Sequence, residues 1–210
     1  YNVLVLPMHP EVLAAKQIAK LDVLSGGRVT LGVGVGAREE DYAAVGALWD
    51  NKRLGRLERQ VARMRCVWKG EKVVAGGLRP VEPYPVQPGG PEILAGAIFP
   101  AGIVRAARWA DGICGFSFGM TPEEVGCAFE GARTAWKAAG RTTPPRLVTG
   151  CWFALGPGGG ERMDEYLRRY LNFVGSEVAP LIAMVPMTSA QALRDAVQRA
   201  RDLGADEIVL

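Results

Sequence analysis

Residues 24–41 read LSGGRVTLGVGVGAREED, and glycine occupies every second position from 32 to 36 at the end of an apolar run. Residues 29–35 lack the clear polar alternation of a strand with one solvent-facing side, so the pattern predicts a strand buried on both faces. Glycines where such a strand ends either let another molecule approach the backbone closely or let the chain turn and pack tightly. These residues alone leave both explanations open.

Short apolar segments alternate with segments of helical period on both sides of this stretch. Apolar residues recur at helical spacing in EVLAAKQIAKLDVL at 11–24, before two glycines. Further helices are predicted over 39–69 with a break near 50–51, over 101–110, from Thr121 onward with Thr121 as N-cap and Glu124 three residues later, over 161–174, and up to 203. The predicted strands cover 2–6, 28–34, 92–97, 113–116, 146–155 and 206–210.

This alternation is typical of a parallel sheet covered by helices, an α/β fold. The spacing alone does not separate a doubly wound sheet from a barrel. In both architectures ligands bind at the carboxyl ends of the strands. The loops that follow residues 6, 34, 96 and 116 are therefore expected on the functional face.

Composition indicates an ordinary globular chain, because 49% of its 210 residues are apolar and 22% are charged. The net charge is +3, but Lys and Arg are scattered among acidic residues, which argues against a nucleic-acid or membrane surface. No signal peptide or apolar run of about 18 residues is found. We expect a single domain over residues 1–210 in the cytoplasm.

Cysteine and histidine usage gives little support for a metal or thiol centre. The four cysteines are widely spaced and form no CxxC pair, which favours buried, reduced thiols over a zinc site or disulfides. His9 is the one histidine, and no partner motif for a catalytic triad accompanies it. It is a candidate for a general acid or a substrate contact, with a loop residue fixed before Pro10 as the alternative.

Four segments together resemble the bacterial luciferase-like oxidoreductase family. They are HPEVLAAKQIAKLDVLSGGRVTLGVGVGAREEDYAAVG at 9–46, RLERQVARMRCVWKGE at 56–71, PVQPGGPEILAGAIFPAGIVRAARWADG at 85–112 and SAQALRDAVQRARDLGADEIVL at 189–210. The likeness spans nearly the whole chain, with the motifs in the family's order. It implies a (β/α)8 TIM barrel that binds flavin mononucleotide (FMN) or the deazaflavin coenzyme F420.

The resemblance also implies that residues 2–7, NVLVLP, correspond to the third barrel strand. A closed barrel of this type has eight strands and about 250 residues. We therefore expect an incomplete, N-terminally truncated barrel that lacks the first two β-α units and has residues 2–6 at one edge. An exposed strand edge further predicts a homo-oligomer.

The resemblance places cofactor contacts at three strand ends. It assigns the backbone of residues 34–37 to the cofactor's phosphate-bearing tail, for which amide N–H groups before a helix are suited. Gly36→Val is therefore expected to weaken cofactor binding more than it weakens the fold. The implied cofactor-binding residues are Asn2, Val3, Gly34, Val35, Gly36, Ala37, Ala95, Gly96 and Ala97.

The function that the resemblance implies is a flavin- or F420-dependent oxidoreductase or monooxygenase acting on a small organic substrate. The hydride chemistry would belong to the cofactor, while the protein orients the substrate and excludes water. Two alternatives stay open. One is a non-catalytic barrel relative that binds a ligand or a partner chain, and the other is a flavin-free barrel enzyme that binds a substrate phosphate at its glycine loops.

Overall fold

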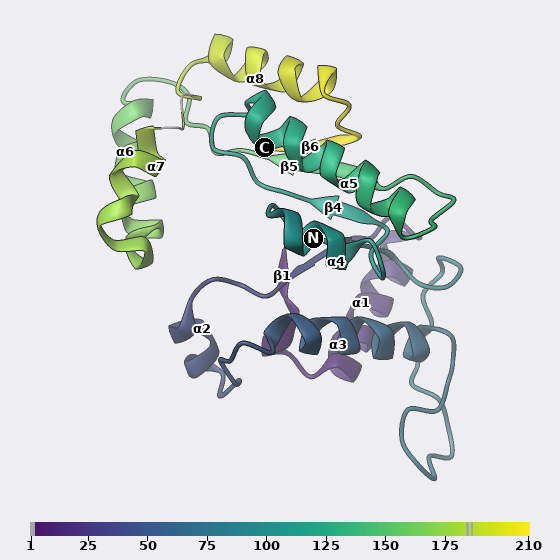
Figure 1. Cartoon of the computed structure of the whole chain (residues 1–210). Coiled ribbons are helices and arrows are strands. Elements are labelled where there is room, and N and C mark those ends of the chain that lie inside the picture. The colour runs from purple at the N-terminus through teal and green to yellow at the C-terminus, as the bar shows by residue number, and fades with distance from the viewer. Residues whose placement is uncertain (1–2, 184, 186) are drawn as a thin grey trace. The chain divides into compact units, whose positions relative to one another are not determined.

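The computed structural model describes residues 3–183, 185 and 187–210, and the chain divides into two compact units. Unit 1 comprises Tyr1–Gly96 with Trp109–Asp111, and unit 2 comprises Ala97–Arg108 with Gly112–Leu210. Figure 1 shows strands and helices alternating along the chain in both units. The α/β class expected from the sequence is confirmed.

Unit 1 contains three parallel strands: β1 (Leu4–Val5), β2 (Thr30–Gly34) and β3 (Glu92–Ala95). Leu4 is opposite Val33, and Leu31 is opposite Ile93. β1 is shorter than the expected strand over 2–6. The chain turns into a 3-10 helix, Leu6–Met8, at Pro7, because proline lacks the N–H that a strand ladder needs.

The helices of unit 1 are α1 (Glu11–Ser25), α2 (Glu39–Ala44) and α3 (Arg53–Trp68). The predicted break near 50–51 is confirmed, since it lies between α2 and α3. α1 ends at Gly26, which has a φ of +65° and donates its N–H to the carbonyl of Val23 at 3.1 Å. This left-handed residue is where glycine is favoured at the end of a helix.

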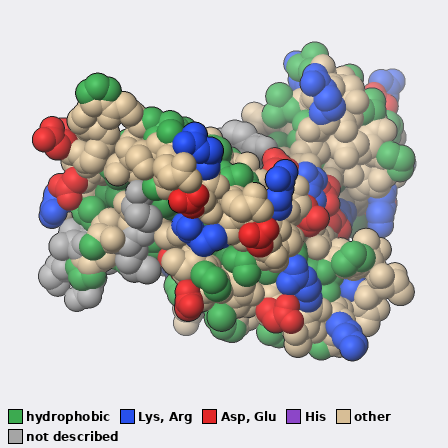
Figure 2. Space-filling model, turned by 90° about the horizontal axis from the view of Figure 1, so that it is seen from above, with side chains coloured by type: hydrophobic (Ala, Val, Ile, Leu, Met, Phe, Trp, Pro, Cys, Tyr) green, Lys and Arg blue, Asp and Glu red, His purple; other side chains and the backbone are tan. Residues whose placement is uncertain are grey.

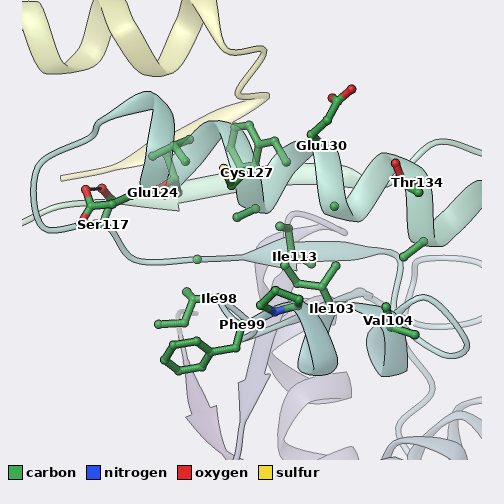
Figure 3. A pocket seen from close by; sticks show the side chains of 18 of the residues that line it. Ile98, Phe99, Ile103, Val104, Ile113, Ser117, Glu124, Cys127, Glu130 and Thr134 are labelled. Carbon is green, nitrogen blue, oxygen red and sulfur yellow. Dashed lines mark hydrogen bonds between the residues drawn. The ribbon is translucent and has the colours of Figure 1, made fainter.

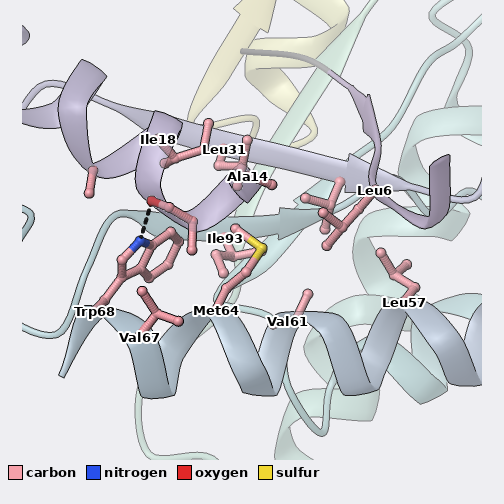
Figure 4. Packing of buried hydrophobic residues seen from close by; sticks show 13 residues of the cluster. Leu6, Ala14, Ile18, Leu31, Leu57, Val61, Met64, Val67, Trp68 and Ile93 are labelled. Atoms are coloured by element: carbon pink, nitrogen blue, oxygen red, sulfur yellow. Dashed lines mark hydrogen bonds between the residues drawn. The ribbon is translucent and has the colours of Figure 1, made fainter. Parts of the chain in front are cut away.

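The core of unit 1 lies between the strands and the helices α1 and α3. Figure 4 shows Val61 and Met64 on α3 pointing toward the strand residues Leu31 and Ile93. Trp68 closes one end of this cluster, where its indole N–H donates to the carbonyl of Ala15 at 2.9 Å. The indole of a buried Trp normally finds such an acceptor.

A buried carboxylate fixes the proline-rich loop to unit 1. Asp22 on α1 accepts the backbone N–H groups of Val86 at 2.9 Å and Gln87 at 3.0 Å, and the Gln87 side chain at 2.7 Å. Burial alone would raise the pKa of Asp22, but these hydrogen bonds outweigh it and hold the pKa below its ordinary value. The loop is long, yet it is anchored at this point.

Unit 2 contains the parallel strands β4 (Gly112–Cys114), β5 (Arg146–Gly150) and β6 (Glu207–Val209). The expected strand over 146–155 was too long, because β5 ends at Gly150. Beyond it the chain leaves the ladder, and the Ala154 N–H donates instead to the carbonyl of Met187 at 3.0 Å. β6 is three residues long and pairs only with residues 148–150 of β5.

The helices of unit 2 follow the expected order with one addition. They are α4 (Pro100–Ala106), α5 (Cys127–Ala138) preceded by a π-helical turn (Pro122–Gly126), α6 (Gly159–Tyr170), α7 (Val178–Ala183) and α8 (Ala190–Asp202). The sequence pattern did not predict α7, which a 3-10 segment (Asn172–Glu177) joins to α6. The predicted cap is confirmed, since the Thr121 hydroxyl oxygen accepts the Glu124 N–H at 3.3 Å.

The surface agrees with the mixed charge seen in the sequence. On the face in Figure 2, basic and acidic side chains of the described residues are interspersed. None of the helices within residues 3–183, 185 and 187–210 combines the length and apolar character needed to cross a bilayer.

The expectation of uniformly buried cysteines was partly wrong. Cys114 and Cys151 are buried, Cys66 is half-buried and Cys127 is exposed. Cys127 opens α5, a helix that buries only the stripe containing Phe129, Ala132 and Trp136. Burial raises the pKa of Cys114 to about 12 and also raises the pKa of Cys151, so these two thiols are inert near neutral pH.

Candidate functional site

The glycines of β2 occupy one face of the strand. Leu31 and Val33 are buried in the core that faces α1 and α3. Side chains alternate along a strand, so Gly32 and Gly34 lie on the opposite face. Both are buried, which confirms the prediction of a strand covered on its two faces.

Gly34 and Gly96 lie side by side at the carboxyl ends of β2 and β3, and the Val3 side chain packs against both. The two strands stay paired here, because the Gly96 N–H donates to the carbonyl of Val33 at 2.7 Å. A Cβ atom would lie 2.9 Å from Cγ1 of Val3 at position 34, and 3.2 Å from the same atom at position 96. We call this space, bounded by Val3, Gly34 and Gly96, the glycine recess.

The turn after β2 continues from the recess. Gly36 has a φ of +65°, and a Cβ atom there would lie 3.0 Å from Cγ1 of Val5. The Tyr42 hydroxyl donates to the carbonyl of Val35 at 2.6 Å, which fixes the turn against α2. Burial raises the pKa of Tyr42, although nearby Arg53 opposes this, so the hydroxyl stays a donor at neutral pH.

Two backbone amides of this turn are available to a ligand. Gly36 and Ala37 are exposed, and their N–H groups have no acceptor among the described residues. Acidic side chains follow immediately, with Glu39 and Glu40 in the first turn of α2 and Asp41 paired with Arg38 at 2.9 Å. These carboxylates disfavour an anion, so the amides suit uncharged oxygen acceptors better than a phosphate.

His9 lies away from this turn. It is exposed at the end of the 3-10 helix, and its backbone carbonyl accepts the Gln60 side-chain amide at 3.0 Å. His9 lines a small pocket of about 460 Å³ with residues of α1 such as Gln17 and Leu21, and none of residues 34–37 lines that pocket. The structure therefore does not bring His9 together with the predicted cofactor residues.

The other predicted cofactor residues have different positions. Asn2 lies outside the described residues. Val3 is 38% exposed and lies just before β1, and Ala95 is the buried last residue of β3. Ala97 belongs to unit 2 and is half-buried. The structure thus gathers Val3, Gly34 and Gly96 in unit 1.

A rigid loop follows the carboxyl end of β4 in unit 2. The Glu124 carboxylate accepts the Ser117 hydroxyl at 2.6 Å, the Phe118 N–H at 3.2 Å and the Gly119 N–H at 2.8 Å. The Ser117 oxygen accepts the Met120 N–H at 2.7 Å. Met120 has a φ of +51°, an uncommon conformation that these hydrogen bonds hold in place.

A large pocket in unit 2 begins at this loop. It has a volume of about 900 Å³ and lies between α4, α5 and β4. Figure 3 shows Ile98, Phe99 and Val104 on the α4 side, with Glu130 and Thr134 on α5. We call it the α4–α5 pocket.

Aromatic side chains cluster where β4 and β5 end. The rings of Phe116 and Trp152 are 4.1 Å apart between centroids, and Phe118 lies 5.3 Å from Phe116 and 5.8 Å from Trp152. On α6, Tyr166 and Tyr170 are parallel to one another at 5.7 Å and meet Trp152 edge-on. Phe116 and Phe118 also line the α4–α5 pocket.

Sequence reasoning missed most of this second group. The predictions placed Glu124 in a cap and gave Phe116, Phe118 and Trp152 no role. A usable signal was present, because Phe116 and Phe118 follow one predicted strand and Tyr166 and Tyr170 are four residues apart on a predicted helix. Such residues meet only if their strands are neighbours in the sheet, and local sequence patterns do not show which strands are neighbours.

The arrangement in unit 1 is suited to binding and not to acid–base chemistry. The recess contains backbone and a valine side chain, and no three His, Cys, Asp or Glu side chains gather into a metal site in the described part of the chain. A site built this way can position a flat molecule. The reactive chemistry would have to come from the bound group.

The chain resembles both curated protein sequences and solved structures. The uncharacterized protein Rv0940c of Mycobacterium tuberculosis (strain ATCC 25618 / H37Rv) is 34% identical over 153 residues, which are 69% of this chain and 50% of the relative. The chain therefore spans about half the length of these curated relatives.

Solved structures share the fold. An F420-dependent secondary alcohol dehydrogenase, in complex with an F420–acetone adduct, has a TM-score of 0.73 at 14% identity and covers 96% of this chain and 69% of its own. The FMN complex of the oxygenating constituent of 3,6-diketocamphane monooxygenase from Pseudomonas putida has a TM-score of 0.68 at 16% identity, with coverage of 99% and 71%. These likenesses confirm the expected TIM-barrel type of α/β fold.

The family assignment rests on a sequence model that covers almost the whole chain. The model of the luciferase-like monooxygenases matches residues 2–208. This range includes the glycine-rich turn, the loop after β4 and the terminal strand. The chain belongs to the luciferase-like monooxygenase family.

Proposed function

We propose that this protein is an oxidoreductase that uses F420 or FMN to act on a small organic substrate. Support comes from membership of the luciferase-like monooxygenase family and from fold neighbours solved with F420 and with FMN. The observation that carries the proposal is the glycine recess. It consists of glycine backbone and the Val3 side chain at the carboxyl ends of two parallel strands, where ligands of such folds bind.

The residues present fit a flat ring system of this kind. Gly34 and Gly96 would let the ring approach the backbone, and Val3 would contact it from β1. The exposed N–H groups of Gly36 and Ala37 would donate to uncharged oxygens, such as ring carbonyls or sugar-alcohol hydroxyls. When bound, either cofactor supplies the redox chemistry of the reaction.

The protein's own part is to bind, to orient and to exclude water. The hydrogen bond between Tyr42 and Val35 holds the turn in place before a ligand arrives, which lowers the entropic cost of binding. Leu31 and Val33 anchor the strand from its other side. We assign no general acid or base, and His9 keeps its backbone role at the end of the 3-10 helix.

A homo-oligomer is part of this proposal. The helix α1 is apolar on more than its buried side, since Leu13, Leu21 and Leu24 are 50%, 48% and 73% exposed. These leucines offer an apolar patch to a second copy of the chain, beside the exposed Lys16, Gln17 and Lys20 of the same helix. Light scattering of the purified protein should give a mass of at least two chains, and a monodisperse monomer would contradict this part.

The test is a fluorescence titration of the purified protein with F420 and, separately, with FMN. One of the two should bind saturably with one molecule per chain. Gly34→Val should weaken that binding by roughly tenfold or more, because its side chain fills the recess without requiring a positive φ.

Gly160→Val on α6 is the matched control, because it makes the same change where a Cβ atom would meet nothing within 4 Å, and it should leave cofactor affinity within roughly threefold of the parent. Thermal melts of both variants without cofactor separate binding from stability. Failure of both cofactors to bind, or equal affinity of parent and Gly34→Val, would refute the proposal.

A further inference from the structure

The α4–α5 pocket has the dimensions and lining of a small-molecule site, and it plays no part in the proposed cofactor site. Its volume of about 900 Å³ falls within the range of roughly 300–1,000 Å³ typical of ligand pockets. Its walls are mainly apolar, with Ile98 and Ile103 from the α4 side and Phe129 from α5. All of its lining residues belong to unit 2.

One end of the pocket is aromatic and rigid. Phe116 and Phe118 line it, and Trp152 packs behind both rings at 4.1 and 5.8 Å. The hydrogen bonds of Glu124 to Ser117, Phe118 and Gly119 fix the backbone that carries the two phenylalanines. Rings held in this way favour a flat aromatic partner, since a ring pair gains roughly 2- to 12-fold in affinity beyond area burial.

The charges around the pocket select against an anion. Glu123, Glu124 and Glu130 line it against the single guanidinium of Arg108, a net charge of −2. Glu130 also pairs at 3.1 Å with Arg133, which does not line the pocket. Without Glu130, the charges of Glu123, Glu124 and Arg108 still sum to a negative value. A carboxylate or phosphate ligand would be repelled.

The space comes from a small residue on α5. Gly131 lines the pocket, and a Cβ atom there would have no atom within 4 Å. We propose that the α4–α5 pocket binds a neutral, planar, apolar organic molecule about the size of two fused rings, placed against Phe116 and Phe118. This proposal does not rest on the proposed redox function.

The test uses calorimetric titration of the cofactor-free protein with three probes that share one carbon skeleton. 1-Naphthol is neutral and planar, decahydro-1-naphthol is neutral but saturated, and 1-naphthoate is planar but anionic. 1-Naphthol should bind with one molecule per chain, and the other two should bind roughly five- to tenfold more weakly or not at all. Equal affinities for all three probes, or no binding of 1-naphthol, would overturn the proposal.

Two glycine variants locate the site. Gly131→Leu fills open space inside the pocket and replaces a poor helix former, so α5 should keep its stability while 1-naphthol affinity falls roughly tenfold or more. Gly160→Leu on α6 makes the same change where a Cβ atom also meets open space but no pocket residue is altered. Gly160→Leu should bind like the parent. Unchanged binding by Gly131→Leu with an intact melt would place 1-naphthol elsewhere and refute the assignment.

Discussion

Replacing Gly36 with alanine tests two reasons for a glycine at this position, its backbone conformation and its close packing against Val5. Gly36 has a φ of +65°, and an L-residue in this region costs about 1–2 kcal/mol. Its Cβ would also lie 3.0 and 3.3 Å from the two Cγ atoms of Val5, which adds about 1 kcal/mol of crowding. We expect Gly36→Ala to lower the free energy of unfolding by about 2–3 kcal/mol.

Gly46→Ala provides a matched control. Gly46 has a φ of +68°, but a Cβ atom there would meet nothing within 4 Å. It should therefore cost only the conformational part, about 1–2 kcal/mol. The difference between the two variants, about 1 kcal/mol, reports the contact with Val5.

Urea unfolding of the cofactor-free protein measures both values, provided that the m-values agree. In a Val5→Ala background, Gly36→Ala should lower the free energy of unfolding only as much as Gly46→Ala does, because the contact between residue 36 and Val5 is then gone. Gly36→Ala no more destabilising than Gly46→Ala would refute the packing part. Gly36→Val should destabilise the fold as well as weaken cofactor binding, since valine would meet Val5 and take up the same unfavourable φ.

Three further outcomes are expected. Asp22→Asn should lower the free energy of unfolding at neutral pH. Because the pKa of Asp22 is lowered in the folded protein, its contribution is present above about pH 4 and disappears as the pH falls through the folded pKa. Urea unfolding at a series of pH values should therefore show the difference between the variant and the parent shrinking on acidification. Glu124→Ala removes three hydrogen bonds from the loop after β4, so a protease should cut near residues 117–120 several-fold faster than in the parent. An unchanged rate of cleavage would mean that these hydrogen bonds do not hold the loop. Cys127 should react with a maleimide in the folded protein before Cys114 and Cys151, and first labelling of a buried thiol would contradict the structure.

The order of elements could be predicted because it depends on local patterns. The apolar spacing over 11–24, the glycines after it and the Thr121 cap act within a few residues, and α1 and α5 follow from them. The ends of the strands were harder to predict from the sequence, because a strand ends where its pairing partner ends. β5 ends at Gly150, and beyond it the Ala154 N–H donates to the distant Met187 carbonyl, which nothing near position 150 reports.

The site was predictable only where it follows from a single strand. Gly32 and Gly34 share a face by the period of the strand, and the structure adds that Val3 and Gly96 lie beside Gly34. Contacts between distant segments could not be predicted, such as Phe116 with Trp152 or Asp22 with Gln87. A role for the His9 imidazole stays a prediction, and the structure shows its backbone carbonyl accepting the Gln60 side-chain amide.

Hydrogen exchange followed by mass spectrometry tests the central claim most directly, because it locates a bound cofactor on the chain. The protein is compared alone and with a saturating amount of whichever of F420 and FMN it binds. Peptides that contain Gly36 and Ala37 should exchange more slowly with the cofactor, since these exposed amides would become covered. Protection confined to other peptides, with these amides exchanging as fast as before, would contradict the account.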